Sequence, residues 1–130
     1  MHYSAQCNQV SITVRPRKAV RFQTSGGSIP FDAWLEKIKD IRTKAKIVTR
    51  IERAELGLFG DWKSIDAEVK ELRIDWGPGY RVYFAISMNK IILLLVGGDK
   101  KSQEKDILKA KDYWSEYKKR EAGNENKSKK

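Results

Sequence analysis

Residues 71–99 read ELRIDWGPGYRVYFAISMNKIILLLVGGD, and this stretch decides the fold. From Glu71 to Ser87, apart from one turn, apolar side chains alternate with polar ones, which is the period of a strand with one buried face. Ile91 to Val96 is apolar at every position, as expected for a central strand covered on both faces. The connections at 76–79 and 88–90 are short, and strands joined by such turns run antiparallel. The stretch therefore predicts an antiparallel meander of three strands.

Helical periodicity flanks this meander on both sides. Apolar residues at spacings of three and four predict one helix from Pro30 to about Ile41 and another from about Thr43 to Leu56. A third helix is predicted from near Ser102 to about Tyr117. Residues 17–24 are expected to form an edge strand and residues 58–64 a loop. This order predicts an α+β fold in which two N-terminal helices and a C-terminal helix pack on a small antiparallel sheet.

The length of 130 residues fits a single domain. We expect residues 1–16 to form a flexible N-terminal arm, residues 17–117 the folded domain, and residues 118–130 a basic disordered tail. The chain has neither a membrane-spanning apolar run nor the apolar segment of a secretory signal. A cytoplasmic protein without a membrane partner is the expectation.

The counts of cysteine and histidine exclude several kinds of site. Cys7 is the single cysteine, so an internal disulfide and a cysteine-rich zinc site are excluded. His2 is the single histidine, which excludes Ser–His–Asp and Cys–His catalysis inside the domain. We expect neither a metal nor a cofactor.

The net charge of +10 comes from 27 basic and 17 acidic residues, and it is spread unevenly. Residues 1–30 contain four basic residues and no acid, whereas residues 99–130 contain eleven basic and seven acidic ones. A surplus of this size favours a polyanionic partner, first of all a nucleic acid. A solvated surface with a basic tail is the alternative that charge alone leaves open.

The parity of the strands places a set of polar side chains on one face of the sheet. The apolar set falls on even positions and should face the helices: Leu72, Ile74, Val82, Phe84 and Ile86. Glu71, Arg73, Arg81 and Tyr83 fall on odd positions and are expected on the opposite, open face. Lys100 and Lys101 follow the apolar strand at its rim, and Lys63 comes from the preceding loop.

This set has the chemistry needed to act on RNA. Guanidinium groups bind phosphate through two hydrogen bonds and stabilise the charge that develops during phosphodiester cleavage. Tyr80 or Tyr83 would stack on a base or move a proton. The exposed face of an ordinary small sheet would contain the same residue types, so the residues alone do not separate an RNA site from a plain polar surface.

Several motifs, in this order and spacing, resemble one known family. The chain is similar to the addiction-module killer proteins, toxins of the RelE/ParE superfamily close to its HigB-like branch, over residues 18–117. The motifs that carry the resemblance are FDAWL (31–35), AKI (45–47), RI (50–51), GDWK (60–63), ELRI (71–74), GPGYRVYF (77–84), LLLVGGDK (93–100) and DILKA (106–110).

The resemblance implies a cytoplasmic toxin of a type II toxin–antitoxin module with a compact α+β fold. Many such toxins are mRNA interferases, endoribonucleases that cut mRNA in the ribosomal A site. The implied partners are mRNA on the ribosome and a cognate antitoxin, with operator DNA bound only through the antitoxin. ParE-type toxins of the same superfamily inhibit DNA gyrase instead, and a non-catalytic basic nucleic-acid-binding module is a further alternative.

Carried over by motif, Arg81 of GYR matches the catalytic or phosphate-stabilising arginine, followed by Arg73 and Lys100. Tyr83 joins this catalytic set from strand parity. The expected RNA-binding side chains are Lys63, Lys101 and Tyr80.

Overall fold

The computed structural model describes residue 12 and residues 14–128. The expectations for His2 and Cys7, and most of the expected N-terminal arm, therefore lie outside the described residues. No helix within the described part of the chain is long and apolar enough to cross a membrane.

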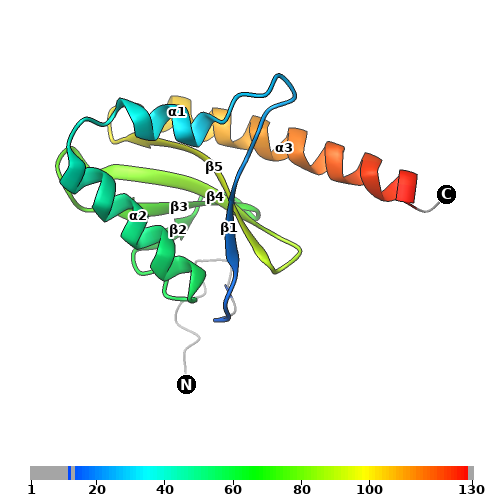
Figure 1. Cartoon of the computed structure of the whole chain (residues 1–130), viewed down its shortest axis with the longest axis horizontal. Coiled ribbons are helices and arrows are strands. Elements are labelled where there is room, and N and C mark those ends of the chain that lie inside the picture. The colour runs from blue at the N-terminus through cyan, green and yellow to red at the C-terminus, as the bar shows by residue number, and fades with distance from the viewer. Residues whose placement is uncertain (1–11, 13, 129–130) are drawn as a thin grey trace.

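A five-stranded sheet forms the centre of the molecule, with the strand order β1-β5-β4-β3-β2 (Figure 1). The strands span Lys18–Arg21 (β1), Trp62–Ser64 (β2), Val69–Ile74 (β3), Tyr80–Ser87 (β4) and Ile91–Asp99 (β5). β3, β4 and β5 form the predicted antiparallel meander, with Leu72 opposite Val82 and Val82 opposite Gly97.

The sheet is mixed, and the prediction of a purely antiparallel sheet is wrong at its first strand. β1 runs parallel to β5, with Lys18 opposite Ile91 and Arg21 opposite Leu94. The chain leaves β1 through two helices, and such a long connection allows strands to lie parallel. β2 lies in the segment that was expected to be a loop. The strand was missed because three residues are too few to show an alternating period.

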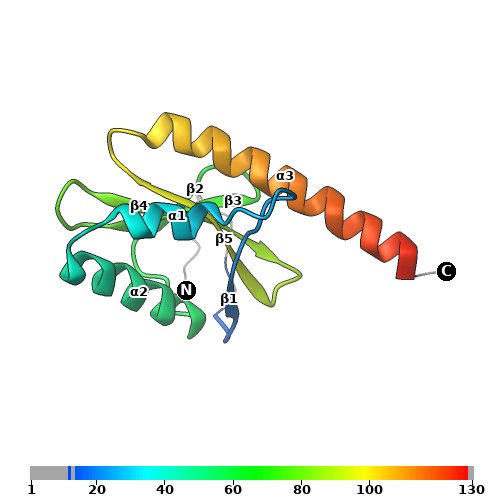
Figure 2. The same ribbon diagram turned by 45° about the horizontal axis from the view of Figure 1, so that its top comes forward.

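Three helices cover the sheet, which agrees with the predicted number. They span Pro30–Lys37 (α1), Ile41–Glu55 (α2) and Gln103–Ser128 (α3). α1 and α2 lie on one side of the sheet and α3 on the other, so the molecule has three layers (Figure 2). The carboxylate of Asp40 accepts from the backbone N–H of Arg42 and the hydroxyl of Thr43, which caps the start of α2.

The predicted inner face of the sheet is confirmed. Leu72, Ile74, Val82 and Phe84 are buried in one core together with Phe31 of α1 and with Ile47, Ile51 and Ala54 of α2. Phe84 is 1% exposed and stacks on Phe59 with 5.5 Å between the ring centroids. Apolar burial of this kind is the main stabilising contribution to the fold.

The opposite face is not open, which corrects the expectation. α3 packs across it and forms a second core with Tyr83, Ala85, Leu93 and Leu95. Ala110 and Trp114 are the α3 residues buried in this core. The apolar run of β5 is thus covered on both faces, as predicted, and the same covering closes most of the face on which Tyr83 lies.

The third helix is longer than expected, since it continues past Tyr117 to Ser128 where a disordered tail was predicted. The segment after Tyr117 is rich in good helix formers, and Glu116 and Arg120 form an ion pair one turn apart. Lys118 also pairs with Glu68, which ties this part of α3 to the start of β3.

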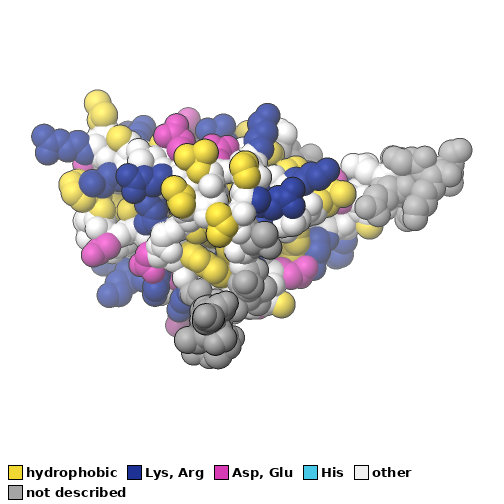
Figure 3. Space-filling model, turned by 90° about the horizontal axis from the view of Figure 1, so that it is seen from below, with side chains coloured by type: hydrophobic (Ala, Val, Ile, Leu, Met, Phe, Trp, Pro, Cys, Tyr) yellow, Lys and Arg dark blue, Asp and Glu magenta, His cyan; other side chains and the backbone are white. Residues whose placement is uncertain are grey.

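The surface of the whole molecule, seen from below, has Lys and Arg side chains on both sides of an apolar strip (Figure 3).

Candidate functional site

Two arginines form a cross-strand pair near the end of the sheet where β3 ends and β4 begins. Arg73 of β3 lies directly opposite Arg81 of β4, and Gly98 of β5 lies on the other side of Arg81. The backbone N–H of Arg73 donates to the carbonyl of Asp61, which precedes β2. Side chains that share a row across a sheet lie on the same face, so both guanidinium groups project to the α3 side. This row lies near the start of α3, where the covering of the sheet ends.

A cavity of about 340 Å³ opens over this row, and we call it the arginine cavity. The side chain of Arg73 is 38% exposed and that of Arg81 is 13% exposed. Three cations and two carboxylates line the arginine cavity together with two other residues, and the full lining is Asp61, Arg73, Ile74, Asp75, Gly79, Arg81 and Lys100. The predicted grouping of Arg73, Arg81 and Lys100 around one space is therefore present.

Glu71 forms an ion pair with Arg81 beside the arginine cavity. Its carboxylate is fully buried, and Oε2 lies 3.5 Å from Nε of Arg81. The same oxygen accepts from the hydroxyl of Tyr83 at 3.0 Å and from the side-chain amide of Gln103 at 2.9 Å. At 3.5 Å Arg81 and Glu71 form an ion pair without a hydrogen bond, and Nε of Arg81 is buried with no hydrogen-bond partner among the described residues. An arginine beside a cavity has further N–H donors on its two Nη atoms. They are available to bind an anion through two parallel hydrogen bonds.

Arg73 forms an ion pair with Asp61. Nη2 and Nε of Arg73 lie 2.8 Å and 3.1 Å from the same carboxylate oxygen. Arg50 of α2 fixes the backbone at this corner, since its guanidinium donates to the carbonyls of Arg73, Phe59 and Asp61. Burial lowers the pKa of Arg50 from its ordinary value, an effect that the nearby Asp61 opposes.

Tyr83 is the catalytic candidate that the structure places differently from the expectation. Its side chain is fully buried in the α3 core rather than on an open face. Burial, followed by the neighbouring charge of Glu71, raises the pKa of the Tyr83 hydroxyl well above its ordinary value. In this position Tyr83 contacts Glu71 and orients it, and it does not reach the arginine cavity.

The expected RNA-binding residues separate into two groups. Lys63 of β2 lies opposite Glu71 in register, half-buried beside the row of arginines. Lys101 is exposed in the turn after β5, and neither lysine lines the arginine cavity. Tyr80 packs against the α1–α2 core, with its ring 6.3 Å from that of Trp34, and therefore faces away from Arg81.

Three further residues support the arginines. Asp61 pairs with Arg73, Glu71 pairs with Arg81, and Gln103 donates to Glu71. Glu71 was expected on the polar face, but its role as the shared acceptor depends on α3 and was not predicted. The apolar character of Ala85 and of residues 91–96 indicates that a helix covers this face, but no pattern in the sequence identifies Gln103 as the residue that contacts Glu71. Within the described ranges, no three His, Cys, Asp or Glu side chains are grouped so that they could bind a metal ion.

Comparison with known proteins places the site inside a matched region. A family model with the description "Phage derived protein Gp49-like (DUF891)" matches residues 33–115, which include Arg73, Arg81, Lys100 and Glu71. An uncharacterized protein of Haemophilus influenzae is 51% identical over 84 residues. This alignment covers 65% of the present chain and 85% of the relative.

Proposed function

Since this chain belongs to the phage-derived Gp49-like (DUF891) family, a toxin–antitoxin-associated family of RelE-like toxins, we propose that it is the toxin of a type II module and an endoribonuclease. Its substrate in this proposal is mRNA on the ribosome, and cleavage arrests translation. A HigB-like toxin is the form that the sequence motifs favour.

The observation that carries this proposal is the arrangement of Arg81. Its Nε lies 3.5 Å from the buried carboxylate of Glu71, and its side chain lines the arginine cavity. A guanidinium that is fixed before the substrate arrives pays little to reorganise during the reaction. Such a group stabilises the charge that develops on the non-bridging oxygens during cleavage. In this step the 2′-hydroxyl gives its proton to water and attacks the phosphorus, the bond to the 5′-oxygen breaks, and that oxygen takes a proton from water.

Arg73 and Lys100 complete the cationic side of the cavity. Arg73 lies opposite Arg81 in the sheet, and Lys100 enters from the turn after β5. In our proposal both bind phosphate oxygens of the substrate, and Arg73 exchanges part of its contact with Asp61 for the phosphate. Tyr83 acts through Glu71 as a positioning residue. Lys63 and Lys101 bind the RNA strand beside the cavity.

The toxin–antitoxin context supports a cognate antitoxin as the protein partner. We propose that the antitoxin neutralises this chain and that the complex contacts operator DNA through the antitoxin. The net charge of +10 suits an acidic partner surface as well as RNA, so the antitoxin and the substrate compete for basic surface.

Induced expression in a bacterial host tests the proposal. Growth is followed while primer extension maps the 5′ ends of a translated mRNA, for the wild type and for Arg81→Lys, which keeps a positive charge beside Glu71. Growth arrest with new 5′ ends inside codons, both lost in the variant, is the expected result. Growth arrest without cuts but with DNA-damage signals would instead indicate a gyrase-directed toxin. Normal growth with the wild type would leave a basic binding module.

A further inference from the structure

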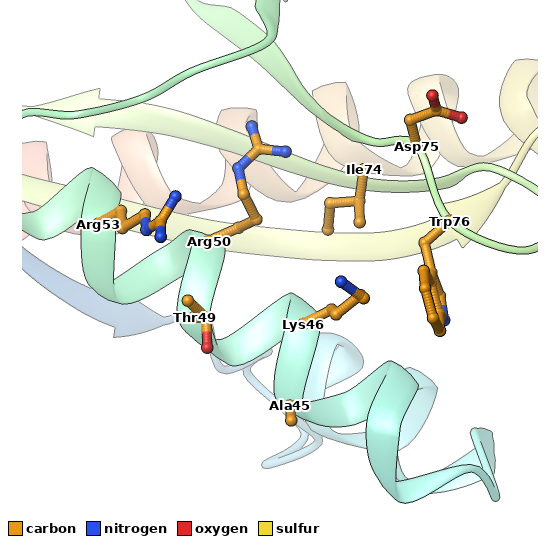
Figure 4. Close-up of a pocket in the computed structure, with 8 residues that line it drawn as sticks. All are labelled: Ala45, Lys46, Thr49, Arg50, Arg53, Ile74, Asp75 and Trp76. Atoms are coloured by element: carbon orange, nitrogen blue, oxygen red, sulfur yellow. The ribbon is translucent and has the colours of Figure 1, made fainter.

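We propose that a second cavity, between α2 and the end of β3, binds RNA nucleotides that flank the cleaved position. This inference rests on the proposed function, because it extends the path of the same substrate. The cavity has a volume of about 370 Å³, and we call it the α2 cavity (Figure 4). Its lining contains three cations of α2, namely Lys46, Arg50 and Arg53, and one aromatic side chain, Trp76.

The two cavities adjoin at the end of β3, where they share two lining residues. Ile74 and Asp75 line both the α2 cavity and the arginine cavity, although the cavities open on opposite sides of the sheet. An RNA strand bound at Arg81 that crosses the end of β3 therefore arrives at α2. No comparable connection leads to the cavity between α1 and α3, whose lining shares neither of these residues.

The cations of the α2 cavity have distinct roles. Arg50 is committed to the protein, since its guanidinium donates to three backbone carbonyls. Lys46 and Arg53 are exposed, and they project from the same side of α2 toward β3 (Figure 4). The ammonium of Lys46 lies 4.3 Å from the centroid of the Trp76 ring. We infer that Lys46 and Arg53 contact two phosphates of the strand.

Trp76 and Asp75 supply contacts of a kind that bases require. The indole N–H of Trp76 donates to the Thr43 hydroxyl at 3.0 Å, which fixes the ring as one wall of the cavity. A base packs against this ring without regard to sequence once the Lys46 ammonium leaves it for a phosphate. Asp75 is exposed and repels phosphate, so the backbone passes beside it. Its carboxylate is able to accept from an exocyclic amino group, as carboxylates do from cytosine.

An acidic segment of a partner protein would also be attracted to these cations. The connection to the arginine cavity favours RNA, since the flanking nucleotides of a bound strand are tethered at this position. An acidic peptide would have no such tether. It therefore enters the experiment as an alternative occupant.

Fluorescence anisotropy tests the inference with labelled single-stranded RNAs of three and ten nucleotides. Arg81→Lys serves as the common background, because it is expected to bind RNA without cutting it. Lys46→Gln/Arg53→Gln in this background removes the two proposed phosphate contacts. Lys105→Gln/Lys119→Gln is the control with the same change in charge, since both lysines are exposed on α3 and line neither cavity. Circular dichroism establishes that each variant is folded.

Each phosphate contact with a single strand contributes about 0.7 to the slope of log K against log salt. The double α2 variant is therefore expected to lower this slope by about 1.4 for the ten-nucleotide RNA and to weaken its binding at low salt at least about tenfold. The three-nucleotide RNA should bind with unchanged affinity, and the α3 control should leave both RNAs unaffected.

An unchanged slope for the ten-nucleotide RNA in the α2 variant would overturn the inference while leaving the proposed function intact. The same slope change, together with no cutting of mRNA on ribosomes by the wild type, would support the RNA subsite and remove the proposed reaction. Loss of binding to a polyglutamate peptide with RNA binding retained would overturn the inference in favour of a protein partner. No RNA binding by Arg81→Lys would overturn the inference, while cleavage of mRNA on ribosomes by the wild type would still support the proposed function.

Discussion

The guanidinium of Arg81 and the carboxylate of Glu71 form an ion pair in which only one partner reaches solvent. Nε of Arg81 lies 3.5 Å from Oε2 of Glu71, whose side chain is 0% exposed against 13% for Arg81. A buried charge that loses its partner is costly, so the two residues depend on each other for stability. Changes at Arg81 therefore act on folding as well as on chemistry, and conservative variants separate the two effects.

Glu71→Gln should lower the rate of mRNA cleavage by roughly tenfold, which corresponds to about 1.4 kcal/mol. Glutamine retains an oxygen that accepts from Tyr83 but removes the charge that orients Arg81. Single-turnover cleavage on programmed ribosomes measures the rate, and thermal melting establishes the fold. Wild-type cleavage by a folded Glu71→Gln protein would show that the ion pair does not position Arg81.

Tyr83→Phe should lower the free energy of unfolding by about 1 kcal/mol, because it removes the hydrogen bond to the buried Glu71. Its cleavage rate should stay within about threefold of the wild type, a change of less than ~0.7 kcal/mol in the barrier. Urea denaturation and single-turnover cleavage are the two measurements. A large loss of rate at unchanged stability would assign Tyr83 a direct part in proton transfer.

Phe84→Ala should lower the free energy of unfolding by about 3–5 kcal/mol, because a buried aromatic ring is replaced by a cavity. Phe84 is 1% exposed and stacks on Phe59 beneath α2. Chemical denaturation of the purified variant gives the value. A change near zero would mean that the even positions of β4 do not face the core.

Asp106→Asn should stabilise the protein at neutral pH and lose this advantage in acid. Burial raises the pKa of the Asp106 carboxyl above its ordinary value of 3.8, so the folded protein favours the protonated form. Protonated Asp106 therefore contributes favourably to the free energy of unfolding. This contribution is complete below the ordinary pKa and is lost as the pH rises through the higher pKa of the folded protein. Unfolding free energies of both proteins between about pH 3 and 7 give the difference. A constant difference across this range would contradict a raised pKa.

Much of the sheet and the core could be predicted from periodicity. Strand parity correctly placed Leu72, Ile74, Val82 and Phe84 beneath the helices, because one face of each strand is apolar. β2 and the parallel pairing of β1 could not be predicted in this way. The three residues of β2 are too few to show an alternating period. The direction of β1, a short edge strand, depends on how α1 and α2 connect it to the rest of the sheet.

The candidate site was predicted in part. Arg73 and Arg81 were placed together because both are odd-numbered residues of one hairpin. Glu71 and Tyr83 were placed on the same face, but their burial and the contact of Glu71 with Gln103 were not predicted, because they depend on α3 covering the sheet. The fully apolar β5 indicated coverage on both faces, and that signal outweighs the polar character of Arg73 and Arg81. Tyr80, expected to bind RNA, has an even number and therefore lies on the inner face, against the first core.

Cleavage of mRNA on programmed ribosomes by purified Arg81→Lys tests the central claim most directly, with Arg42→Lys as the matched control. Lysine keeps the charge beside Glu71 but loses the two parallel hydrogen bonds to phosphate. Arg42 is exposed on α2 and lines neither the arginine cavity nor the α2 cavity. We predict a loss of about 10²–10³ in the rate for Arg81→Lys, with a melting temperature near that of the wild type, and no loss for Arg42→Lys. Equal rates for all three folded proteins would contradict the account.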